Sequence, residues 1–198
     1  MKKLKIVLVL LISVVMLNGF WSGKSDKEEA REDKIEKQKD ISERLETNKK
    51  TLSDLYAYAE ESKKMIASSY GYATFSNVGV NVIFFSAEGG SGLAHNNKTE
   101  KNTYMNMASG GVGLGLGAKD FRIIFLFENK KAFNNFVNSG WEANAQADAA
   151  AKVEEKGGAL NAAVTVAPGI RMYKLTKNGL ALQATIQGTK YWKDNDLN

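Results

Sequence analysis

Charged residues predominate between Lys24 and Ser69, and this stretch contains no Pro and no Gly. Apolar side chains recur there every seven residues, at Leu45, Leu52, Ala59 and Ile66. Such spacing is typical of a narrow apolar face on a helix whose other faces are polar. The pattern predicts a helix over 24–69 whose C-terminal half docks on the following domain. Pairing with a second copy of the same helix is the alternative.

The pattern changes at Tyr70 to short apolar runs separated by Gly and Asn, which predict β-strands. We expect strands at 72–75, 78–85, 104–118, 121–127, 160–167, 170–175 and 180–186. The run at 121–127 is the most apolar and is therefore expected to be central. Helical spacing returns at 129–138, and Gly140 follows it as a stop signal. Residues 89–92 (Gly-Gly-Ser-Gly) are expected to end one strand, and 95–98 to form a turn or an exposed loop.

Glycine occupies every second position of 111–117. Alternate residues of a strand point to opposite faces, so one face here is bare backbone. A bare face allows another element to pack closely or the sheet to bend sharply. The predicted fold is α+β: a long N-terminal amphipathic helix, a curved, mainly antiparallel, glycine-rich sheet of about six to eight strands, and one further helix at Lys130–Val137. Whether the sheet closes into a barrel-like form is left open.

The first residues have the composition of an export signal. Lys2, Lys3 and Lys5 precede an apolar run at 6–17 that is interrupted only by Ser13. That run is shorter than the about 20 residues that a spanning helix needs. We therefore expect a signal peptide or N-terminal anchor at 1–23, a charged helical spacer at 24–44 and one domain at 45–198.

The composition excludes several kinds of chemistry. The chain has no Cys, which excludes disulfides, thiolate metal sites and a lipid-modified cysteine, and His95 is its only His. The net charge is +5, and three of the positive charges are lysines of the N-terminal segment, which is too weak a balance to indicate nucleic acid binding. Outside the helix the carboxylates are scattered. We expect no catalytic residues, no metal, no cofactor and no enzymatic activity. A hydrolase acting on envelope polymers is a minor alternative.

Several segments resemble, in order, those of the SYLF domain, also called the Ysc84-like domain. Residues 70–75 (Tyr-Gly-Tyr-Ala-Thr-Phe) resemble its opening, and residues 111–118 (Gly-Val-Gly-Leu-Gly-Leu-Gly-Ala) resemble its glycine-containing strand. Phe133, Phe136 and residues 140–142 (Gly-Trp-Glu) are similar to the helix and turn that follow. Ser76 stands where that family usually has proline. The resemblance covers about residues 52–193 and is closest to bacterial exported members.

The resemblance implies a lipid-binding module rather than a catalyst. Eukaryotic members of the family are associated with phosphoinositide membranes and with actin. For the bacterial members, which are exported, lipid binding is the leading proposal. The resemblance therefore implies an exported, periplasmic and membrane-associated protein. The lipoprotein form of some bacterial relatives is not available here, because the chain has no Cys.

Six residues are candidates for contact with lipid: Lys49, Lys50, Lys63, Lys64, Phe84 and Phe85. The lysines flank the apolar face of the helix and could lie at anionic headgroups, and the two aromatic rings could insert shallowly. A solvated helix face and a buried aromatic pair are the alternatives. We expect a non-catalytic module of the cell envelope that binds anionic phospholipid or phosphoinositide-like lipids, with membrane lipids as partners and no nucleic acid. The alternative is an envelope scaffolding or protein-interaction domain whose N-terminal helix pairs with an envelope protein or with itself.

Overall fold

The computed structural model describes residues 26–82, 85–111, 121–143, 163–176, 179–180 and 188–198. The chain divides into two compact units, one ending at Lys39 and one beginning at Asp40. Residues 26–39 are the first part of helix α2 (Asp26–Tyr58), and all of them are exposed. The sheet and the other two helices belong to the unit that begins at Asp40.

Helix α2 is followed by α3 (Glu61–Ser68) and, after four strands, by α4 (Lys130–Ser139). The predicted single helix over 24–69 is wrong in one respect, because the helix breaks at Ala59 and Glu60. Ala59 is buried there, and Ile66 of α3 lies in the same apolar cluster as Leu55 of α2. The break redirects the chain so that both helices pack on the sheet. Docking on the domain, rather than pairing with a second copy, thus accounts for this part of the apolar face.

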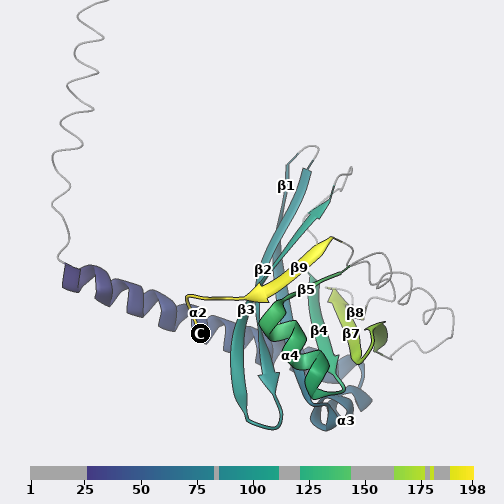
Figure 1. Cartoon of the computed structure of the whole chain (residues 1–198). Coiled ribbons are helices and arrows are strands. Elements are labelled where there is room, and N and C mark those ends of the chain that lie inside the picture. The colour runs from purple at the N-terminus through teal and green to yellow at the C-terminus, as the bar shows by residue number, and fades with distance from the viewer. Residues whose placement is uncertain (1–25, 83–84, 112–120, 144–162, 177–178, 181–187) are drawn as a thin grey trace, which may run out of the picture. The chain divides into compact units, whose positions relative to one another are not determined.

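The strands of the described residues form one curled antiparallel sheet, a half-barrel, which confirms the α+β fold (Figure 1). Their bounds are β1 (Gly71–Val82), β2 (Phe85–Asn96), β3 (Lys101–Gly111), β4 (Phe121–Phe127), β5 (Trp141–Glu142), β6 (Val164–Ala167), β7 (Ile170–Thr176), β8 (Gly179–Leu180) and β9 (Thr189–Lys193). Their order is β5-β9-β3-β2-β1-β4-β7-β6, and β8 pairs with β7 off this path. Strand β4 lies inside the sheet between β1 and β7, as its apolar sequence predicts.

The two faces of the sheet carry separate apolar clusters. Along β4, Ile123, Phe125 and Phe127 pack with α4, whereas Ile124 and Leu126 pack with residues of α2 and α3. This alternation explains why the strand is a continuous apolar run rather than an alternating one, since both of its faces are covered. We call these faces of the sheet the α4 face and the α2 face.

The α4 face is filled largely by aromatic rings. The ring of Phe125 lies 5.1 Å from that of Phe136 on α4 and 5.1 Å from that of Tyr191 on β9. Helix α4 begins where Asn129 accepts a hydrogen bond from Ala132 N at 3.0 Å, which caps its first turn. It ends at Gly140, which has φ 73° and is the predicted stop.

Glycine makes room for two of these rings. A Cβ on Gly92 would lie 2.0 Å from the carbonyl oxygen of Thr74 and 2.6 Å from Cδ1 of Phe75. A Cβ on Gly71 would lie 2.7 Å from the ring of Phe133. On the α4 face, side chains therefore approach the bare backbone of glycine closely, as was expected for the alternating glycines. Of the alternating glycines, those at 113–117 lie outside the described residues.

The sheet differs from the sequence pattern in several details. The strand expected at 72–75 and most of the one expected at 78–85 form one long strand, β1, and residue 85 instead begins β2, which was not predicted as a strand. The glycine cluster at 89–92 lies inside β2 instead of ending a strand, because its register with β1 and β3 continues through it. Strands β5 and β9 were not predicted, since both are short. The turn expected near 95–98 occurs at 97–100, and parts of the strands expected at 104–118, 160–167 and 180–186 lie outside the described residues.

Candidate functional site

The four candidate lysines fall into two pairs on different helices. Lys49 and Lys50 lie on α2, Lys63 and Lys64 lie on α3, and all four side chains are exposed. Lys50 forms an ion pair with Asp54 one turn further along α2, at 3.2 Å. The structure therefore does not unite the four lysines in one patch on one helix, and the two pairs can be tested separately.

Helix α3 lies at one end of the sheet, together with the β2–β3 turn and the start of α4 (Figure 1). Asn97 of the turn donates from Nδ2 to the carbonyl oxygen of Ile66 at 2.7 Å and to that of Ser69 at 3.1 Å. Tyr70 N donates to the carbonyl oxygen of Phe127, three residues before α4, at 2.8 Å. These bonds fix three segments that are far apart in the sequence beside one another.

Each of these three segments carries two exposed lysines. We name this surface the basic end, and its residues are Lys63, Lys64, Lys98, Lys101, Lys130 and Lys131. Four exposed glutamates lie on or beside the same segments: Glu60, Glu61, Glu100 and Glu128. The surface is therefore basic by a small excess, with two lysines on each of its three segments.

The first turn of α4 contains Lys130 and Lys131 and no acidic residue. A helix N-terminus carries partial positive charge, so cations in this turn are unfavourable by a few tenths of a kcal/mol each, on the order of the dipole effect. Helix stability therefore does not explain the choice of lysine at these two positions. Binding of an anionic surface at this end of the molecule would explain it.

His95, the single histidine, lies beside the basic end in a structural role. Its Nδ1 is 2.7 Å from Oδ1 of Asn102, its Nε2 is 3.3 Å from a carboxylate oxygen of Glu100, and its ring lies 5.2 Å from that of Tyr72. These contacts hold the ring across the β2–β3 hairpin. Burial raises the pKa of the Tyr72 phenol, so this hydroxyl stays protonated at neutral pH.

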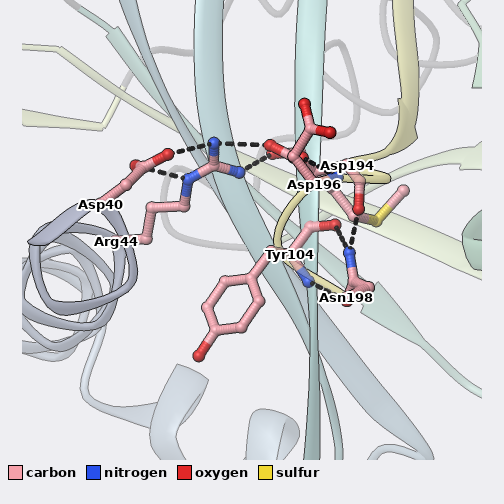
Figure 2. A network of polar contacts seen from close by, with 7 residues as sticks. Asp40, Arg44, Tyr104, Asp194, Asp196 and Asn198 are labelled. Carbon is pink, nitrogen blue, oxygen red and sulfur yellow. Dashed lines mark hydrogen bonds and ion pairs between the residues drawn. The ribbon is translucent and has the colours of Figure 1, made fainter. Parts of the chain in front are cut away.

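A network of polar contacts joins α2 to the C-terminal residues (Figure 2). Arg44 is 7% exposed and donates to the carbonyl oxygen of Met105 at 2.9 Å and to Oδ2 of Asp194 at 2.8 Å. It also pairs with Asp40 on its own helix at 2.9 Å. The side chain of Asn198 bonds both backbone groups of Tyr104 on β3. We name this arrangement the C-terminal latch, since it ties the last residues to β3 and both to α2.

The latch lowers the pKa of the Asp194 carboxyl. Burial alone would raise this pKa, but hydrogen bonds from Asp196 N and from Arg44, with the charge of Arg44, outweigh it. The carboxylate is therefore ionised at neutral pH and balances the buried guanidinium. The ion pair thus joins α2 to the residues that follow β9.

Helix α2 meets successive strands through polar side chains. Asn48 accepts a hydrogen bond from Thr74 of β1 at 2.8 Å, and Asp54 pairs with Arg122 of β4. The hydrogen bond from Arg122 is the largest cause that lowers the pKa of Asp54. The contact of Arg44 with β3 precedes these two along the helix, so α2 runs across the strands rather than along them.

The remaining predictions for site residues have mixed outcomes. Phe84 lies outside the described residues, and Phe85 is the first residue of β2, so shallow insertion of this pair stays a prediction. In the described part of the chain, no cluster of three or more His, Asp or Glu is placed to hold a metal ion. None of the helices in that part is long and apolar enough to cross a membrane.

Sequence reasoning missed Lys98, Lys101, Lys130 and Lys131, and it missed the latch. The lysines stand in ordinary polar sequence, next to a turn and a helix start, and only the fold brings them beside α3. The C-terminal Asp194 and Asn198 had the appearance of a solvated tail. A pair of lysines in a helix first turn that lacks acidic residues was the one signal available in advance.

Comparison with known proteins identifies a relative that matches part of the chain. No family model matches the chain. It is 40% identical over 110 residues to Beta cell expansion factor A of Aeromonas veronii, and the match covers 54% of this chain and 40% of that protein. The chain thus spans about two fifths of the relative's length, and the action on beta cells that the relative's name describes belongs to that protein.

Proposed function

We propose that the protein is a non-catalytic lipid-binding module of the cell envelope that contacts anionic phospholipid, phosphoinositide-like headgroups included, through the basic end. One observation carries this proposal: three segments that are distant in the sequence each place two exposed lysines at the same end of the sheet. Export of the chain and a membrane-associated, periplasmic location belong to the same proposal. The resemblance to the SYLF family points in the same direction.

Electrostatics sets the expected strength of this contact. A lysine near an anionic membrane contributes about 1 kcal/mol, and salt screens it within about 10 Å at 0.1 M ionic strength. The four glutamates at the basic end offset part of the attraction. The binding should therefore be peripheral, reversible and sensitive to salt.

The test is co-sedimentation of the chain from Lys24 with vesicles of phosphatidylcholine, alone or mixed with phosphatidylglycerol, at low and high salt. We expect binding only to the anionic vesicles and loss of this binding at high salt. The variant Lys63→Glu/Lys64→Glu changes the basic end, and Lys49→Glu/Lys50→Glu is its matched control with the same change in net charge. The α3 variant should bind clearly less than the α2 variant. Equal losses would show a response to net charge alone, and a wild-type chain that stays in the supernatant would refute lipid binding.

A second candidate function is protein interaction through the N-terminal part of α2. Residues 26–39 are exposed throughout, and they include a large apolar side chain, Ile35, that is 60% exposed. Light scattering of the chain from Lys24 over a range of concentrations tests the self-paired form. A mass that rises with concentration and is restored to that of a monomer by Ile35→Glu would favour it, whereas a strict monomer would exclude it.

A further inference from the structure

The α2 face of the sheet carries an exposed tryptophan. Trp192 of β9 is 40% exposed, although its neighbour Tyr191 is fully buried among the rings of the α4 face. Adjacent residues of a strand point to opposite faces, so Trp192 lies on the α2 face. The fold therefore leaves part of this large aromatic side chain in contact with solvent.

Four polar residues continue from Trp192 across the sheet in register. Trp192 is paired with Asn106, Asn106 with Ser91, Ser91 with Ser76, and Ser76 with Arg122. In its own strand, each of these four residues is next to a residue that belongs to the α4 face. These adjacent residues are Met105, Gly92, Phe75 and Ile123. By alternation the four polar side chains share the face of Trp192. We name these five residues the transverse row.

The transverse row is accessible and largely uncharged. Asn106, Ser91 and Ser76 are half-buried, and the Asn106 side chain hydrogen-bonds to Asp194 of the latch. Arg122 is 22% exposed and pairs with Asp54 of α2. The next position along β2 on this face is Gly89, which is exposed, and a Cβ placed there would meet nothing within 4 Å. The side of the row away from α2 is therefore open at β2.

We propose that the transverse row is a binding site for an extended carbohydrate chain. Sugar rings have an apolar face that stacks on an indole and an equator of hydroxyl groups that exchange hydrogen bonds with amides, hydroxyls and guanidinium–carboxylate pairs. The row offers these groups in that order, from Trp192 to the Arg122–Asp54 pair. Strands are about 4.8 Å apart, a spacing close to the length of one ring in an extended glycan. This site is separate from the basic end and does not depend on lipid binding.

The chemistry favours carbohydrate over the other polymers that a sheet face can hold. The centre of the row is neither cationic, as a polyanion would need, nor apolar, as an acyl chain or an amphipathic helix would need. It also consists of side chains on the sheet surface, whereas an extended peptide would pair with backbone groups at a sheet edge.

The experiment is a titration of the chain from Lys24 with β-1,4-linked hexamers of glucose and of N-acetylglucosamine, followed by calorimetry and by tryptophan fluorescence. We expect binding of at least one hexamer, with an affinity lowered at least tenfold by Trp192→Ala. Ser91→Gln, which would block the middle of the row, should lower it as well. Lys193→Ala is the matched control, since it alters the adjacent exposed residue on the opposite face and should leave the affinity unchanged.

Three results would overturn the proposal. One is the absence of binding to either hexamer at millimolar concentration. Another is binding that folded Trp192→Ala and Ser91→Gln variants retain in full. The third is a fluorescence change of Trp192 with vesicles of phosphatidylcholine and none with the hexamers, which would assign the tryptophan to a membrane contact.

Discussion

At the scale of single residues, the latch contains a buried positive charge that must be balanced by a nearby carboxylate. Arg44 is buried, and Asp194 is the buried carboxylate that faces it. Without Asp194, the buried guanidinium keeps only Asp40, which is 41% exposed, as an ion-pair partner. Asp194→Ala should therefore lower the free energy of unfolding by about 2 kcal/mol, the cost of losing a charge-assisted hydrogen bond in a buried place, as measured by urea denaturation. Asp196→Ala, which removes an exposed carboxylate of the same segment, should change it little.

The contribution of the same ion pair to stability depends on pH. The pKa of Asp194 is lowered in the folded protein relative to its ordinary value of 3.8. Its contribution to stability is therefore present above about pH 4 and is lost as the pH falls through the lowered value, because the unfolded chain then binds the proton more readily. The urea midpoint of the wild type should fall more steeply below pH 4 than that of Asp194→Asn. Parallel curves for the two proteins would mean that other carboxylates, Asp54 among them, account for the acid sensitivity.

At the scale of elements, strand β2 contains two glycines with opposite requirements. A side chain at Gly92 would collide with the backbone of β1 and with the ring of Phe75, whereas one at Gly89 would enter open space. Gly92→Ala should lower the free energy of unfolding by about 2–3 kcal/mol through overpacking. Gly89→Ala should leave it unchanged or raise it by up to about 1 kcal/mol, since alanine is less flexible in the unfolded chain. Urea denaturation of both variants measures the difference, and equal effects would contradict this account of the α4 face.

Local patterns predicted most of the elements, and the exceptions have physical causes. Strand β4 and helix α4 follow from an unbroken apolar run and from helical spacing that ends at Gly140. The glycine cluster in β2 was interpreted as the end of a strand, because the ring of Phe75 that packs against Gly92 lies in another strand. The break at Ala59 is invisible in the sequence, since alanine is a good helix former and only the position of the sheet requires a change of direction.

At the scale of the whole molecule, the candidate sites are products of the fold. Lys63 and Lys64 were predicted from the helix, yet the lysines that extend their surface come from a turn and a second helix. The transverse row draws one residue from each of five strands. The latch joins residues that are 150 positions apart. The residues of each site are far apart in the sequence, so no short segment reveals them. The order and register of the strands bring them together.

The latch also bears on where the folded domain begins. The charge pattern placed this boundary at residue 45, but Asp40 and Arg44 lie in the compact unit that begins at Asp40. A chain that starts at Asp40 keeps the cation opposite Asp194 and should unfold at the same urea concentration as the chain from Lys24. A chain that starts at Leu45 leaves the buried Asp194 without its guanidinium and should be less stable by about 3 kcal/mol. Asp194→Ala should destabilise the chain from Leu45 far less than the longer chains, because in that chain the pair is already broken. If the chain from Leu45 proved as stable as the chain from Asp40, the latch would not contribute to stability, and the boundary at residue 45 would stand.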